Sequence, residues 1–272
     1  MKTLFLSDLE KEYSELVETG KIQIVEDVKK LTSKQFSYSY PLYFSGNIRS
    51  QIAIVTFRPT QKILGNDNYP TDFDTYQNKQ QNLGRFFLDF DTDERLESEY
   101  STDIRLLNYL KPFQVIRFNG DSLQKNLQKL TNEKLELDLV PYLSPDFCEK
   151  DFMGNYNVCK PFIERVLNGV LAYPRQYVIF IGECFGKVLA EYIVDSESFS
   201  FMLTSPNRPN QKSVARFTRV TLNYNDRVVI AGIAESFFDE GLDDAMIEKY
   251  GRESVAIIHR GLLLANPLWK SQ

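Results

Sequence analysis

The sequence predicts an α/β fold in which a mostly parallel central sheet lies between two layers of helices. Four apolar runs of five to seven residues, rich in Val, Ile, Leu and Phe, occupy residues 52–57, 135–141, 177–181 and 228–234. Short runs of this kind, separated by helix-like segments, are typical of buried parallel strands. We therefore expect a three-layer αβα sandwich formed by one domain over residues 1–272.

Residues 1–50 predict a helical N-terminal appendage packed on this core. Ser7 and Asp8 offer side-chain oxygens to the start of a helix, and Gly20 is suited to end it before a second helix. Residues 34–50 then lead into the first core strand.

The rest of the chain predicts further helices and strands around the four runs. We expect helices over residues 77–89, 94–110, 123–129, 161–172, 186–193, 242–250 and 254–264. A strand is expected over 114–118, and residues 217–223 and 227–233 predict a hairpin turned at Asn225 and Asp226, or two separate strands. Residues 204–212, rich in Pro, Asn and Gln, predict a surface loop.

The acidic character of the chain disfavours an extended nucleic-acid interface. The net charge is −5 and the pI about 5.2, whereas a dedicated nucleic-acid binder usually carries a basic surface. A local basic patch is still compatible with this total. Its positions would be Lys187 and the densest basic stretch, which contains Arg208, Lys212, Arg216 and Arg219.

Composition also limits the compartment and the chemistry. No apolar stretch approaches the 18–20 residues that a membrane span needs, and the N-terminus turns acidic after six residues, unlike a secretory signal. Three cysteines without metal-ligand spacing predict reduced thiols and a cytoplasmic location. A single histidine, His259, excludes a zinc site of several imidazoles, and we expect neither a metal nor a cofactor.

The loops that follow the four runs carry polar and reactive groups. They span residues 58–60, 142–145, 182–186 and 235–238. Because the carboxyl ends of parallel strands meet at one sheet edge, where open α/β folds bind ligands, these loops predict a shared pocket.

One of these loops permits a nucleophile hypothesis. Gly182, Cys184 and Gly186 follow a strand and precede a helix, as in a nucleophile elbow. With His259 as base and one of Asp239, Asp243 and Asp244 as the orienting acid, Cys184 would be the nucleophile of an acyl hydrolase. The alternative is that Cys184 and His259 are packed residues without a catalytic role.

The order of the four strand-and-loop segments resembles the uracil-DNA glycosylase superfamily. The segments are Ile54-Val-Thr-Phe-Arg-Pro-Thr, Leu137-Asp-Leu-Val-Pro-Tyr, Ile179-Phe-Ile-Gly-Glu-Cys-Phe-Gly-Lys and Val229-Ile-Ala-Gly-Ile-Ala-Glu-Ser-Phe. Their order and spacing extend over residues 51–240. Pro59 matches the proline of the family's first motif, and Asp138 stands where the family often has an Asn that reads the pyrimidine. The last loop keeps Ser236 without the family's His and Pro.

The resemblance implies a hydrolase of base-excision DNA repair, or a diverged relative that only binds. Phe57, or a tyrosine from residues 69–76, would stack on a flipped base, and Asp138 would bind its Watson–Crick edge. A carboxylate, Asp67 or Asp72, would orient the attacking water. The partner class implied is DNA or a nucleotide.

Candidate site residues follow from these loops and from the resemblance. The catalytic candidates are Asp72, Glu235 and Ser236. The substrate-binding candidates are Phe57, Arg58, Pro59, Tyr76, Asp138, Tyr142, Gly182 and Lys187. In the alternative reading Asp138 is a solvated strand-end residue, Pro59 and Pro141 merely end strands, and the protein is a non-catalytic interaction protein. The sequence leaves the oligomeric state open.

Overall fold

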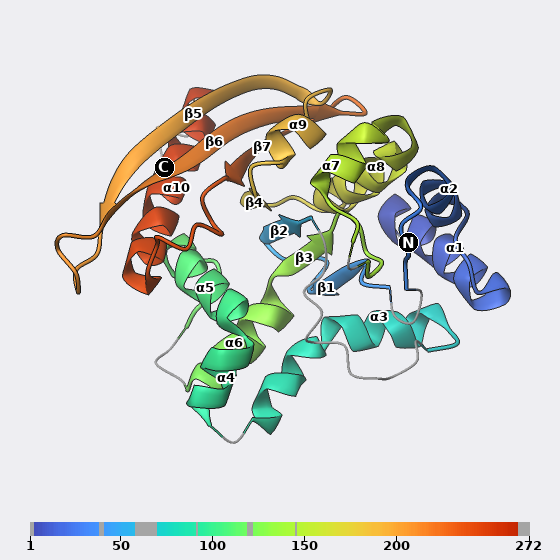
Figure 1. The fold of residues 1–272 in the computed structure, drawn as a ribbon, viewed down its shortest axis with the longest axis horizontal. Helices are drawn as coiled ribbons and strands as arrows, with labels where there is room; N and C mark the ends of the chain where they lie inside the picture. The colour runs from blue at the N-terminus through green and yellow to red at the C-terminus, as the bar shows by residue number, and fades with distance from the viewer. Residues whose placement is uncertain are drawn as a thin grey trace. The chain divides into compact units, whose positions relative to one another are not determined.

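The computed structural model describes residues 3–37, 41–57, 70–90, 92–118, 122–144 and 146–265. The chain forms two compact units, each built from two separate stretches of sequence (Figure 1). Unit 1 comprises Met1–Phe86 and Thr131–Arg175, and unit 2 comprises Phe87–Leu130 and Gln176–Gln272. The chain passes between the units within a 3-10 helix, η1 (Leu83–Asp89), within α6 (Leu123–Glu133) and after Arg175.

Unit 1 contains three strands in the order β1-β3-β2. Its elements are α1 (Leu4–Thr19), α2 (Gln23–Thr32), β1 (Phe44–Gly46), β2 (Ile52–Thr56), α3 (Phe73–Gln81), β3 (Leu135–Asp138), α7 (Glu149–Gly154) and α8 (Tyr156–Leu171). Strands β2 and β3 run parallel, with Thr56 opposite Asp138, whereas β1 is antiparallel to β3. The carboxyl ends of β2 and β3 therefore lie side by side.

The N-terminal helices of unit 1 pack on α8, as Figure 1 shows in blue and yellow-green. Helix α1 begins after Thr3, whose hydroxyl caps Leu6, rather than at the expected Ser7. Gly20 ends α1 with φ of +69°, as the sequence predicted. Leu9, Tyr13 and Leu16 form the buried stripe of α1, at the spacing of one helix face.

Unit 2 contains four strands in the order β4-β7-β6-β5. Its elements are α4 (Asp93–Glu99), α5 (Ser101–Leu110), η2 (Lys111–Phe113), β4 (Tyr177–Ile181), α9 (Phe185–Val188), β5 (Ile193–Thr204), β6 (Lys212–Tyr224), β7 (Arg227–Ala234) and α10 (Asp244–Ala265). Strands β4 and β7 are parallel, while β5, β6 and β7 form an antiparallel meander. The α/β class is thus confirmed, with a parallel pair joined to antiparallel strands in each unit.

Several element predictions for unit 2 need correction. Residues 114–118 form no strand, because Gln114 adopts a left-handed φ of +56° directly after η2. The two expected C-terminal helices are one, α10, and the helix expected over residues 186–193 ends at Val188. Strand β5 was not predicted, because its Ser, Asp and Glu residues lack an apolar run. The hairpin of β6 and β7 is confirmed, with Asn225 and Asp226 at positive φ.

Candidate functional site

The carboxyl ends of β2 and β3 in unit 1 hold a buried carboxyl group. Asp138, the last residue of β3, is 7% exposed, and its Oδ1 accepts a hydrogen bond from the Thr56 hydroxyl at the end of β2. The parallel register places these two residues opposite each other. Among the described residues, Thr56 is the hydrogen-bond partner of the Asp138 carboxyl.

Burial raises the pKa of Asp138 well above its ordinary value of 3.8. The nearby Glu136 carboxylate raises the pKa further, while the Thr56 hydrogen bond and the cations of Lys134 and Arg165 partly oppose the shift. The protonated form is therefore favoured. A protonated carboxyl offers one O–H donor together with acceptor oxygens, which is the pattern that an amide edge needs.

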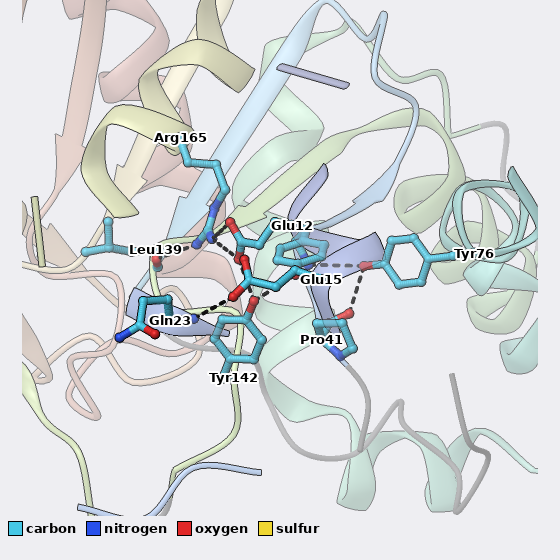
Figure 2. Close-up of polar contacts among 9 residues, drawn as sticks. Glu12, Glu15, Gln23, Pro41, Tyr76, Leu139, Tyr142 and Arg165 are labelled. Atoms are coloured by element: carbon cyan, nitrogen blue, oxygen red, sulfur yellow. Dashed lines mark hydrogen bonds and ion pairs between the residues drawn. The ribbon is translucent and has the colours of Figure 1, made fainter. Parts of the chain in front are cut away.

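Figure 2 shows a charged network of unit 1 that includes Arg165, whose charge acts on the pKa of Asp138. The Arg165 guanidinium of α8 is 3.2 Å from Glu12 Oε1 of α1 and donates to the Leu139 carbonyl at 3.1 Å. Tyr142 donates to the same Glu12 oxygen at 2.5 Å, and its hydroxyl is 2.7 Å from that of Tyr43. Burial raises the pKa of both tyrosines, and the Glu12 charge raises it further, so their hydroxyls stay protonated.

Tyr76 extends the network into the core instead of a binding surface. Its hydroxyl donates to the Pro41 carbonyl at 2.7 Å and accepts from the Tyr43 amide at 3.2 Å. The Tyr76 ring is fully buried and lies 4.5 Å from the Tyr13 ring, centroid to centroid. In this conformation Tyr76 holds β1 and α1 to α3 and exposes no face to a base.

Phe57 lies next to Thr56, at the end of β2, and is only half-buried. Its ring is nearly parallel to that of Phe147, with an interplanar angle of 12° and centroids 6.4 Å apart, and Phe152 packs against it edge-on. The Phe57 carbonyl accepts from the Val140 amide at 3.0 Å, which fixes the backbone beside Asp138. The aromatic side chain of Phe57 is thus held in place directly after Thr56, the residue that donates a hydrogen bond to Asp138.

Unit 2 gathers a second polar group at the carboxyl ends of β4 and β7. Arg216 of β6 is 3.5 Å from both Glu183 and Glu235, the latter of which accepts from Thr218 at 2.5 Å. Gly182, which directly follows β4, adopts a φ of +118°, a conformation that favours glycine. The Arg216 and Glu183 side chains are 57% and 72% exposed, so this is an open surface cluster.

Ser236 is committed to the backbone of β6. Its hydroxyl accepts from the Arg216 amide at 3.0 Å, and the Arg216 carbonyl accepts from Tyr250 of α10 at 2.5 Å. Both bonds tie the end of β7 and α10 to β6. Lys187 is exposed on the short helix α9. Among the described residues, no hydrogen bond joins it to Ser236.

Asp72 serves as the N-cap of α3. Its Oδ1 accepts from the Thr75 amide at 2.8 Å, and this hydrogen bond lowers the pKa of the carboxyl. This capping role explains the aspartate at position 72 without a catalytic function. Arg58, Pro59 and Asp67 lie outside the described residues.

The structure does not bring Cys184 and His259 together, as the cysteine nucleophile hypothesis requires. The His259 Nε2 atom is 2.6 Å from the hydroxyl of Tyr177, the first residue of β4, and the two rings stack. Cys184 follows the other end of β4, which advances about 13 Å over its five residues. His259 and Cys184 are therefore at opposite ends of this strand.

Alkylation of the three thiols tests this conclusion. Cys148 is exposed, whereas Cys159 and Cys184 are buried, and burial raises the pKa of the Cys159 thiol to about 12. We expect iodoacetamide near pH 7.5 to modify Cys148 at least ~10-fold faster than the other two, as followed by peptide mass spectrometry. Cys148→Ser serves as the control. Rapid labelling of Cys184 in the folded protein would restore the hydrolase hypothesis.

Sequence reasoning found Asp138 and Tyr142 but missed their partners. Glu12 and Arg165 are charged residues on helices, where a solvated position is the ordinary expectation. The sequence does contain a signal that Glu12 is partly buried, because Glu12 lies next to the apolar stripe of α1. Tyr43 lies in an aromatic segment whose individual roles only the tertiary structure separates.

Comparison with protein-family models and with curated proteins finds no match. Among the described residues, no three or more His, Cys, Asp or Glu side chains are arranged to hold a metal ion. Of the described helices, none combines the length and the apolar character that crossing a bilayer requires.

Proposed function

We propose that the protein binds a pyrimidine base at the carboxyl ends of β2 and β3, as a diverged relative of the uracil-DNA glycosylase superfamily. The observation that carries this proposal is the buried Asp138 carboxyl beside Thr56, whose raised pKa favours the protonated form. A protonated carboxyl pairs with the N3–H and O4 of uracil or thymine through one donated and one accepted hydrogen bond.

Binding without base excision is the activity that we propose. Asp72 is engaged as a helix cap, and Ser236 and Glu235 are hydrogen-bonded within unit 2. Phe57 supplies the apolar neighbour of the base. The proposal includes the three-layer αβα arrangement and the cytoplasmic location that the sequence predicts.

Calorimetric titration with 2′-deoxyuridine tests the proposal. We expect binding that is strongest at low pH and weakens as the pH rises through the raised pKa of Asp138, because ionisation removes the donor. Methylation of the base at N3 is expected to weaken binding at least ~10-fold, since it leaves a buried acceptor oxygen unsatisfied, at a cost of about 1–3 kcal/mol.

Two variants of Asp138 sharpen this test. Asp138→Asn keeps one donor and one acceptor, so binding should persist and lose its pH dependence, whereas Asp138→Val should abolish it. Binding that is equal for the N3-methyl nucleoside, or unchanged in Asp138→Val, contradicts the proposal. Release of free uracil from uracil-containing DNA, with abasic sites left in the strand, would show that excision is retained.

A further inference from the structure

Strand β5 is the outermost strand of the sheet in unit 2 (Figure 1). It spans twelve residues, and within the described part of the chain it pairs only with β6. An outer strand of this length presents a row of backbone N–H and C=O groups that another strand can pair with. Proteins usually protect such an edge with short strands, prolines, charges or bulges.

The protection on β5 is confined to its first part. A register irregularity lies between Ile193 and Asp195, and the two acidic residues are Asp195 and Glu197. Residues 198–204, Ser-Phe-Ser-Phe-Met-Leu-Thr, contain no charge, proline or glycine. Within them Met202 is 56% exposed and both phenylalanines are only half-buried. This segment has the composition of a pairing-prone edge.

The hydrogen-bond pattern identifies which backbone groups face outward. The Ser205 amide donates to the Gln211 carbonyl at 3.2 Å, which continues the pairing of Thr204 with Lys212. In an antiparallel ladder the residues that bond to one neighbour alternate with those that point away from it. Odd-numbered residues of β5 therefore bond to β6. The outward-facing groups belong to Ser196, Ser198, Ser200, Met202 and Thr204.

We propose that this edge pairs with β5 of a second copy of the chain, antiparallel, with Ser200 opposite the second copy's Ser200. This two-fold register matches outward-facing residues with outward-facing residues, so both strands exchange backbone hydrogen bonds. It also places Phe199 opposite the second copy's Phe201, twice, and buries the exposed parts of both rings. Cross-strand aromatic pairs of this kind stabilise antiparallel sheets.

Charge disfavours registers centred near the acidic start of β5. With Ser200 at the centre, Glu197 lies opposite the second copy's Leu203, so no carboxylate meets a carboxylate. A centre shifted to residue 197 would oppose the two Glu197 side chains, which is unfavourable. The antiparallel arrangement also brings the acidic start of β5 towards the end at which Lys212 of β6 pairs with Thr204.

Sedimentation velocity over a range of protein concentrations tests the proposal. We expect a reversible dimer, and Ser200→Pro should weaken it at least ~10-fold, because proline removes an outward N–H without removing a bond to β6. Ser200→Ala is the matched control and should dimerise like the wild type. A monomer at every concentration, or a dimer that Ser200→Pro leaves intact with an unchanged melting temperature, overturns the proposal.

Disulfide formation tests the register independently of any folding defect in the proline variant. In a Cys148→Ser background, Ser200→Cys places two thiols directly opposite each other, at a Cα separation of about 5.5 Å that a disulfide can span. Ser196→Cys is the control, since its counterpart would be about 26 Å away. We expect rapid oxidation to a covalent dimer only for Ser200→Cys. Equal rates for the two variants contradict the proposed pairing.

Discussion

Replacement of Arg165 by methionine is expected to destabilise the protein by about 3–5 kcal/mol, the cost of breaking a buried ion pair by removing one partner. Arg165 is 8% exposed, and its guanidinium satisfies both the Glu12 carboxylate and the Leu139 carbonyl. Methionine retains most of the aliphatic volume but removes the guanidinium that pairs with the Glu12 charge. Urea unfolding followed by circular dichroism measures the loss.

Two further variants separate the buried charge from general damage. In Glu12→Gln/Arg165→Met the uncompensated carboxylate is absent, so part of the lost stability should return. Arg252→Met removes an exposed ion pair with Glu248 on α10 and should cost no more than about 0.5 kcal/mol. A loss below about 1 kcal/mol for Arg165→Met would show that Glu12 is well solvated without its partner.

Buried strands were predictable because burial leaves an apolar run in the sequence. Strand β4 has the predicted bounds, Tyr177–Ile181, and all five of its residues are buried. Strands β2 and β3 begin where predicted and end at Thr56 and Asp138. The prediction placed the end of each of these two strands within three residues of its true position, whereas Asp138 lies inside the predicted run and was singled out by the family resemblance.

Other elements depend on packing that no local pattern reveals. Strand β5 is exposed and polar at its start, so it is defined by pairing with β6. Helix α10 continues through Gly251, which lies between the two helices predicted over residues 242–250 and 254–264. A Cβ at Gly251 would lie 2.0 Å from the Tyr109 carbonyl, so glycine permits the close approach of α10 to α5. Glycine has low helix propensity, so its place within α10 was not predictable from the local sequence.

The site was predictable only where its residues follow a strand. Asp138 and Tyr142 come from the end of β3, whereas Glu12 and Arg165 come from helices more than 100 residues apart in sequence. Their pairing is a property of how α1 and α8 pack in unit 1. The raised pKa of Asp138 likewise depends on burial. The burial of an aspartate at a strand end cannot be predicted from the local sequence.

Replacement of Asp138 by asparagine is expected to stabilise the protein at neutral and alkaline pH. The folded protein holds the Asp138 proton to a higher pH than the unfolded chain, whose carboxyl titrates near 3.8. The stability that this group contributes is therefore fully present below pH 3.8 and is lost as the pH rises through the raised pKa. Asparagine keeps the Thr56 hydrogen bond without a charge to bury.

Thermal unfolding between pH 4 and pH 8 measures this effect. Because each unit of pKa difference corresponds to about 1.4 kcal/mol, we expect Asp138→Asn to gain at least ~1 kcal/mol at pH 8 and nothing near pH 4. Asp72→Asn is the control of opposite sign, because the pKa of Asp72 is lowered and its carboxylate favours folding above pH 3.8. If Asp138→Asn were destabilising at pH 8, folding would not raise the pKa of Asp138, and the carboxyl would be ionised at neutral pH and unable to donate a hydrogen bond to a base.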